Sequence, residues 1–246
     1  MFFLPISGHA VSLRPPGGIE ELRLTEASDA GVSTGLTLAS SCALLPPDSP
    51  AWPDLPLADL HAALLALRRL LEGDDLVSEV RCVSCKEKVD LSFSITGYLQ
   101  AHAPGKVRGL KAAGDGWFQT GSVVFRLVTV ADAIAASGSA DPETYLRSVC
   151  VRTGSANRAE AAMRKIAPLL SGELAGQCPE CRSAVTVWFD PVAFVLAELR
   201  DRAAAVYRDV HLLASVYGWS ESQILQLPRL RRERYVEMID ASGGPA

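Results

Sequence analysis

Two Cys-x-x-Cys pairs that lie far apart in the sequence constrain the fold more than any other feature. The pairs are Cys82-Val-Ser-Cys85 and Cys178-Pro-Glu-Cys181, and their first cysteines are 96 residues apart. The two segments align without a gap, CVSCKEKVDLSFSI over CPECRSAVTVWFDP. Each segment has the pattern of a turn that carries two thiols and leads into a β-strand, which is typical of one half of a zinc ribbon.

Two such turns together provide four thiolates, the ligand set of a closed tetrahedral zinc site. The sequence therefore predicts one structural Zn²⁺ per chain, bound by Cys82, Cys85, Cys178 and Cys181. Compact zinc ribbons separate their pairs by about 15 to 20 residues, whereas 92 residues lie between the pairs here. A large module must be inserted between the turns. The four thiolates would leave no coordination position for a substrate or an activated water.

Two other interpretations of the cysteines stay open. The pairs could be two separate redox or disulfide pairs, or unrelated buried cysteines. A thioredoxin-like motif lies between a strand and a helix, whereas strand-like segments follow both pairs here. The remaining thiols, Cys42 and Cys150, lie in apolar segments, and we predict that they are buried and structural.

Composition and charge exclude some of the classes to which this protein could belong. The chain has 246 residues, 48% of them hydrophobic, and a formal net charge of -4. A chain of this size and composition can bury a substantial hydrophobic core. Its net charge is negative, so it lacks the overall positive potential that attracts nucleic acids. Its longest charge-free run, between Asp29 and Asp48, is interrupted by glycines and prolines, so no membrane-spanning helix is predicted. We expect a cytoplasmic protein with no membrane partner, and the net charge favours protein partners over nucleic acids.

Hydrophobic periodicity predicts an α+β fold: a zinc-ribbon-like pair of cysteine turns with a long inserted module, followed by a helical C-terminal region. Residues 10–25 predict two short strands, and regularly spaced leucines over 56–72 predict an amphipathic helix. Asp190-Pro191 marks the start of one long helix that keeps its apolar register to Tyr217 and ends at Gly218. A capping-box pattern, Ser220 to Gln223, and Pro228 introduce two further helices.

These elements suggest three segments. Residues 1–75 hold the N-terminal strands and the amphipathic helix, and residues 76–190 hold the split zinc ribbon with an inserted α/β module. Residues 191–246 hold the long helix and a helical corner. We call residues 217–235 the C-terminal corner.

No arrangement of residues that would support catalysis is visible. The sequence contains no His-Glu-x-x-His, no Gly-x-Ser-x-Gly and no Walker loop, and its four histidines are scattered. We therefore expect neither an enzyme nor a small-molecule substrate.

The C-terminal stretch carries an ordered succession of residues: His211, Leu213, Ala214, Tyr217-Gly-Trp-Ser-Glu221, Ile224, Leu225, Leu227-Pro228, Arg231, Arg232 and Tyr235. This succession resembles the C-terminus of the baseplate-assembly chaperones of T4-like tailed phages and contractile injection systems. The resemblance covers about the last 30 to 55 residues and leaves about the first 170 unmatched. It implies a non-enzymatic protein, a chaperone or a retained component, that binds protein partners of a baseplate, hub or tail tube. It also implies a location in the cytoplasm of a bacterium or a phage-infected cell, free or within an assembled particle.

The C-terminal corner is also the predicted partner surface, because Trp, Tyr and Arg dominate binding hot spots. Its candidate residues are Tyr217, Trp219, Arg229, Arg231, Arg232 and Tyr235. A plainer interpretation is that the aromatic residues anchor the turn and the arginines form a solvated face. Two alternative functions remain: a zinc-ribbon nucleic-acid-binding or regulatory module, for which the turns offer only Lys86, Lys88 and Arg182, and a thiol oxidoreductase.

Overall fold

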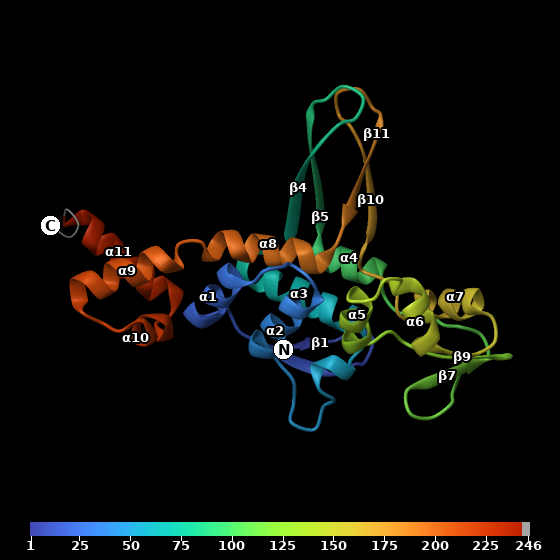
Figure 1. Ribbon diagram of the computed structural model, residues 1–246. Helices are drawn as coiled ribbons and strands as arrows, with labels where there is room; N and C mark the ends of the chain where they lie inside the picture. Colours follow the sequence, from blue (N-terminus) through green and yellow to red (C-terminus); the bar gives the residue numbers. More distant parts are fainter. Residues whose placement is uncertain (243–246) are drawn as a thin grey trace.

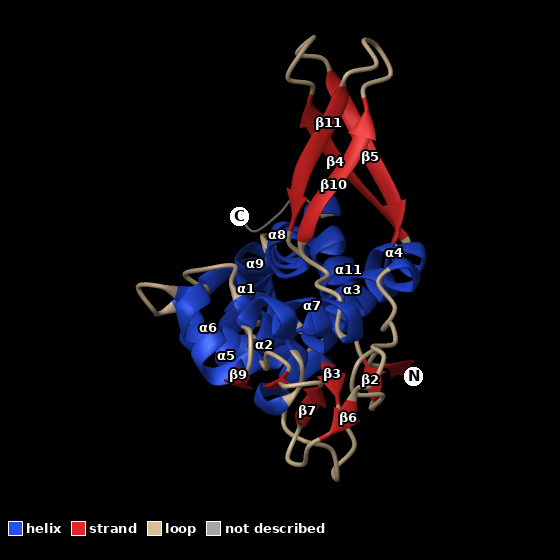
Figure 2. Ribbon diagram, turned by 90° about the vertical axis from the view of Figure 1, so that its right-hand side faces the viewer, coloured by secondary structure: helices blue, strands red, loops and turns tan. Residues whose placement is uncertain are grey.

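The computed structural model describes residues 1–242, in which two long β-hairpins project side by side from a body of helices (Figures 1 and 2). The first hairpin joins β4 (Asp75–Arg81) to β5 (Lys88–Ser94), and the second joins β10 (Gly172–Gln177) to β11 (Ala184–Phe189). The predicted mixture of helices and strands is confirmed. None of the helices of residues 1–242 is long and apolar enough to cross a lipid bilayer.

Helix α3 (Leu57–Glu72) lies at the centre of the body. It packs against α2 (Val32–Cys42), α4 (Ile95–Ala101) and α8 (Pro191–Ala203), and every residue from Ala58 to Arg68 is buried. The sequence predicted a single apolar stripe on this helix, but alanines on its other faces let neighbouring elements approach on all sides. Gly35 of α2 allows a close approach, since a Cβ there would lie 2.9 Å from Val192.

The N-terminal segment contains one strand fewer than predicted between residues 10 and 25. Strands β1 (Phe2–Phe3), β2 (Ala10–Leu13) and β3 (Ala43–Leu44) form a small antiparallel sheet, but residues 18–26 form helix α1 (Gly18–Glu26) instead of a strand. The helix begins where the Glu20 carboxylate accepts a hydrogen bond from the Gly17 amide at 2.7 Å. Acidic residues in the first turn also favour a helix through its dipole.

The module between the hairpins combines a four-stranded antiparallel sheet with helices. The sheet has the order β6 (Lys111–Ala112), β7 (Trp117–Thr120), β8 (Val123–Arg126) and β9 (Val151–Thr153). Helix α7 (Ala156–Ile166) packs on one face, where Phe125 and Ala159 are fully buried. Helices α5 (Val130–Ser137) and α6 (Pro142–Cys150) connect the sheet to the body, and a short 3-10 turn, Trp52–Asp54, packs beside α5.

The long helix predicted from Asp190 to Tyr217 is two helices, which corrects the sequence interpretation. Helix α8 ends at Ala203 and α9 (Val206–Tyr217) begins after a turn at Ala204 and Ala205. The apolar register continues through the break, because both turn residues keep right-handed helical backbone angles. The Arg202 carbonyl near the end of α8 accepts a hydrogen bond from Arg229 Nη1 at 2.8 Å.

Helices α10 (Glu221–Gln226) and α11 (Arg229–Ala241) complete the chain. The C-cap Gly218 has φ 67°, and the capping box of Ser220 and Gln223 is present, as predicted. The main hydrophobic core draws on residues of all three predicted segments, from Leu4 to Leu199, while α9 to α11 surround a smaller core of their own. The three-segment division stays a prediction, and the last four residues of segment 191–246 lie outside the described residues.

Candidate metal centre

The four cysteines of the two pairs meet at the tips of the two hairpins. All four sulfur atoms lie within 4.8 Å of one another. Two sulfur contacts join the hairpins, with 3.6 Å between the sulfurs of Cys82 and Cys181 and 3.6 Å between those of Cys85 and Cys178. The fold thus brings together cysteines that the sequence separates by more than 90 residues.

This arrangement fits a tetrahedral metal ion. Four thiolates bound to zinc at about 2.3 Å lie about 3.8 Å from each other in a regular tetrahedron, which agrees with the observed contacts of 3.6 Å. Four sulfur ligands also favour zinc or another thiophilic ion over magnesium or calcium. The four cysteines could therefore hold one metal ion, with no coordination position left open.

The two cysteine turns have the same backbone structure. In the first turn the Lys86 amide bonds to the Cys82 carbonyl at 3.0 Å, and in the second the Arg182 amide bonds to the Cys178 carbonyl at 2.9 Å. Lys86 and Arg182 both adopt the left-handed conformation, with φ 66° and 59°. Glycine is the residue that adopts this conformation without strain. The geometry of the turn is therefore maintained despite an unfavourable residue at its last position.

Hydrogen bonds from the turns stabilise thiolate rather than thiol. The backbone amides of Cys85 and Ser84 lower the pKa of Cys82. The hydroxyl and amide of Ser183 lower the pKa of Cys181 to about 6. Metal binding requires deprotonated cysteines, so both effects favour a metal site. The role of Ser183 was not predicted from the sequence, although its position two residues after Cys181, a candidate ligand, was a usable signal.

The pKa of Cys85 is raised rather than lowered, because the other three cysteines lie beside it. The Glu87 amide lowers its pKa, but desolvation and the adjacent sulfurs of Cys181, Cys178 and Cys82 raise it to about 12. Four thiolates repel one another when no cation lies between them, and a divalent ion removes that repulsion.

The two sequence segments that align at a spacing of 96 residues also have equivalent structures. Within the first hairpin Arg81 pairs with Lys88, and within the second Gln177 pairs with Ala184, which are the positions 96 residues further on. The equivalence extends past the strands, because Ser94 caps α4 and Asp190, also 96 residues later, caps α8. The repeating unit is therefore a strand, a cysteine turn, a second strand and a helix start.

A small apolar cluster packs beside the four cysteines. Buried Val89 and Val185, which are equivalent in the repeat, pack beside Cys82 and Cys178. Gly176 of β10 allows the two hairpins to approach closely, since a Cβ there would lie 2.6 Å from Leu91. The first cysteine of each pair is almost completely buried, whereas Cys181 is exposed.

The two remaining cysteines lie away from this cluster. Cys42 and Cys150 are 0% and 2% exposed, which confirms that they are buried thiols. Burial raises the pKa of each to about 11. Both therefore stay protonated near neutral pH and are poor metal ligands.

The C-terminal corner holds the predicted partner-binding residues. Tyr217, Trp219 and Tyr235 form an aromatic cluster, in which Tyr217 and Trp219 stack with ring centroids 4.9 Å apart and Tyr235 meets Trp219 edge to face. Tyr217 is 38% exposed, Trp219 and Tyr235 are half-buried, and Arg231 is exposed. The aromatic residues thus anchor the turn and also reach the surface.

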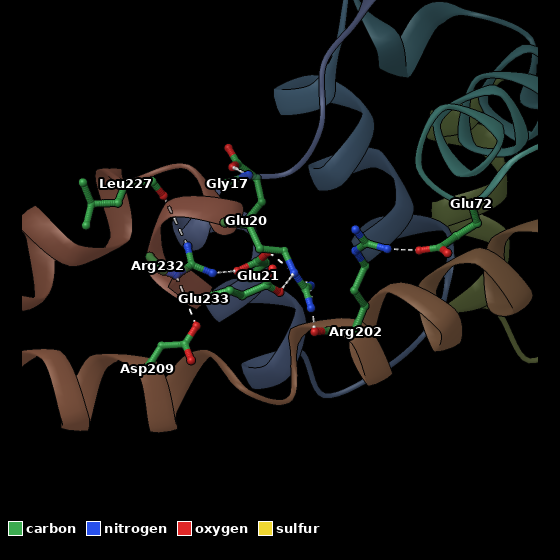
Figure 3. Close-up of polar contacts among 10 residues, drawn as sticks. Gly17, Glu20, Glu21, Glu72, Arg202, Asp209, Leu227, Arg232 and Glu233 are labelled. Carbon is green, nitrogen blue, oxygen red and sulfur yellow. Dashed lines mark hydrogen bonds and ion pairs between the residues drawn. The ribbon is translucent and has the colours of Figure 1, made fainter. Parts of the chain in front are cut away.

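Arg232 does not belong to an exposed arginine surface, which corrects its place among the partner-binding candidates. Its side chain is 1% exposed and lies between the carboxylates of Glu21 and Asp209 (Figure 3). Gly18 of α1 provides the space, because a Cβ there would lie 2.6 Å from Arg232 Nη1. Arg229 is only partly exposed and pairs with Glu233 at 2.6 Å and Glu21 at 3.5 Å. These arginines connect α11 to α1.

Comparisons with known proteins give no match to this chain: no family model, no curated protein and no solved structure is significantly similar.

Proposed function

We propose that the chain is a non-enzymatic zinc protein in which Cys82, Cys85, Cys178 and Cys181 bind one structural Zn²⁺. The observation that carries this proposal is the meeting of four sulfurs within 4.8 Å at the tips of two hairpins. Such a site has protein ligands at every position and holds distant chain segments together without catalysing a reaction.

We further propose that this protein assists the assembly of a phage tail or a contractile injection system, as a chaperone or as a retained baseplate component. The resemblance of the C-terminal stretch supports this role. The exposed part of the C-terminal corner gives a surface for it. Tyr217, Trp219 and Tyr235 form a cluster that reaches solvent, and the exposed Arg231 lies one helical turn from Tyr235 on α11. Clustered aromatic side chains beside an arginine suit the centre of a protein interface.

The zinc proposal is tested by metal analysis of the purified chain combined with thiol titration. We expect about one zinc per chain, and we expect a chelator to release four reactive thiols together. Disulfides within the two pairs, or thiols that react fully without a chelator, would contradict the site and would favour a redox role.

The assembly proposal is tested by co-expression with the baseplate, hub and tail-tube proteins encoded beside this chain. We expect a complex that is lost in the double variant Trp219→Ala, Arg231→Ala. Arg234→Ala is the matched control, because Arg234 lies on the same helix with an exposed ion pair to Glu237. An unchanged complex with the double variant would exclude the corner as the binding surface.

A further inference from the structure

The module inserted between the hairpins has a charge opposite to that of the rest of the chain. Residues 103–167 contain nine basic and five acidic residues, whereas the remaining residues contain 15 basic and 23 acidic ones. In Figure 1 the sheet of this module lies at the opposite end of the molecule from α9 to α11. The chain as a whole therefore has an acidic net charge, although the end of the molecule formed by residues 103–167 is basic.

One face of the four-stranded sheet is not covered by α7. Phe118 and Phe125 pair across β7 and β8 and point into the core under α7. Side chains alternate along a strand, so their neighbours Trp117 and Arg126, which also pair, point to the other face. Lys111 pairs with Gln119 and lies on that same open face, where both residues are exposed.

Arg152 of β9 is held on this open face by Trp117. Its guanidinium carbon lies 3.9 Å from the centre of the indole ring, a close cation–π contact. The Arg152 side chain is exposed and makes no hydrogen bond or ion pair within residues 1–242. Lys111 likewise has no ion pair with any described residue. The face therefore presents a fixed guanidinium and an ammonium group whose donors are free for an anion.

The other arginine of this face is already neutralised. Arg126 donates two hydrogen bonds to the Asp132 carboxylate, at 2.5 and 2.8 Å. In this pair a guanidinium on the open face binds a carboxylate through two parallel hydrogen bonds, which is the geometry expected for an acidic ligand.

We propose that the open face of the β6–β9 sheet, with Arg152 and Lys111 as its two anion-binding groups, docks an acidic segment of a partner protein. The charge of the module supplies complementarity, and the cation–π contact fixes Arg152 in advance of binding. This proposal rests on the proposed assembly role, because it names a second contact for the same class of partner, far from the C-terminal corner.

The geometry favours an acidic polypeptide over a nucleic acid. Arg152 covers one side of the only indole on this face, and Arg126 lies 6.0 Å from the same ring. Base stacking, which supplies much of the affinity for single strands, needs an open aromatic face. Carboxylates need only the exposed donors of Arg152 and Lys111.

The test measures binding of fluorescent poly-L-glutamate and of oligothymidylate with matched charge to the full, metal-loaded chain. We expect poly-L-glutamate to bind about tenfold more weakly to the double variant Lys111→Gln, Arg152→Gln, since two charge-assisted contacts are lost. The matched control is Arg158→Gln, Lys165→Gln, which removes two exposed cations of α7 on the other side of the sheet. We expect the control to retain its affinity.

Three binding results and one co-expression result would overturn the proposal. Poly-L-glutamate that does not bind, or an equal loss in both double variants, would show that the face is not a specific site. Tighter binding of oligothymidylate through the same two residues would make the face a nucleic-acid surface. These results do not depend on the assembly role. If the tail-protein complex is lost in the corner variant but not in the Lys111 and Arg152 variant, the assembly role stands and the acidic-segment proposal fails.

Discussion

Phe93 and Phe189, which are 96 residues apart in the sequence, meet edge to face between the bases of the two hairpins. Their ring centroids are 5.3 Å apart and their planes are inclined by 83°. The two residues are equivalent in the repeat. The repeat also exchanges the two sulfur contacts, Cys82 to Cys181 and Cys85 to Cys178, because Cys82 is equivalent to Cys178 and Cys85 to Cys181. Equivalent residues that contact each other indicate an approximate twofold relation between the hairpins. One axis thus relates the ligand pairs at the tips and the phenylalanines at the base.

We predict that Cys178→Ser loses its bound zinc and that both hairpins become sensitive to protease. Three sulfurs and a hydroxyl bind zinc far more weakly than four thiolates, and the apolar cluster below the sulfurs is small. Zinc content by mass spectrometry and limited proteolysis measure the effect. Cys42→Ala is the control, which we expect to keep its zinc because Cys42 lies in the main core. Full zinc content and unchanged protection in Cys178→Ser would contradict the site.

We predict that Arg182→Gly stabilises the metal-loaded protein by about 1 kcal/mol. Its left-handed φ of 59° costs a non-glycine residue about 1 to 2 kcal/mol, and glycine loses part of that gain through the entropy of the unfolded chain. Urea unfolding of variant and wild type gives the difference. Lys88→Gly, in the extended backbone of β5, should instead destabilise. A destabilised Arg182→Gly would mean that the side chain contributes more than its backbone strain costs.

We predict that His61 makes the protein less stable as the pH falls from about 6.5 to about 4. Burial lowers the pKa of His61 to about 4, against an ordinary value of 6.5, and Asp190 opposes this only in part. The unfolded chain therefore binds a proton in this window while the folded chain does not, so the free energy of unfolding decreases by about 3 kcal/mol. Above pH 6.5 the residue has no such effect.

The variant His61→Leu isolates this effect, because other groups also titrate at low pH. The Nδ1 atom of His61 has no hydrogen-bond partner, so its removal leaves no polar atom unpaired. We expect the stability difference between wild type and variant to change between pH 6.5 and 4 and to be constant above pH 6.5. Parallel curves over the whole range would exclude a buried, neutral His61.

We predict that Arg232→Met destabilises the protein by about 3 to 5 kcal/mol. Glu21 and Asp209 are each 5% exposed, and removal of the guanidinium leaves two buried carboxylates with weak compensation. Thermal or urea unfolding measures the loss. Arg234→Met should change stability by less than about 0.5 kcal/mol, because its ion pair with Glu237 is exposed. Equal effects of the two variants would show that the buried contacts contribute little.

The cluster of four cysteines was predictable from the sequence because its signal is local. Each Cys-x-x-Cys and the strand after it lie within about 14 residues, and the gapless alignment of the two segments relates them without knowledge of the fold. The strand that follows each cysteine turn was predicted for the same reason, and the structure confirms both strands. Caps at Asp190, Gly218 and Ser220 are also local, and the structure confirms them.

The features that the sequence did not reveal depend on distant contacts. Arg232 resembles its neighbours Arg231 and Arg234 in the sequence, and its burial depends on contacts with α1 and α9. The break after Ala203 leaves the apolar spacing unchanged, so periodicity alone cannot detect it. Trp117 and Arg152 are 35 residues apart, and their contact requires the sheet order of the inserted module.

The four cysteines of the candidate metal site are divided between two hairpins, and this division has a consequence during synthesis on the ribosome. The second cysteine pair is synthesised about 5 to 20 s after the first, at about 5 to 20 residues per second. During that interval the inserted module is synthesised, and the first hairpin has only two of the four cysteines. The proposed zinc site can therefore be completed only after the whole inserted module has been synthesised, and an early disulfide between Cys82 and Cys85 would prevent it.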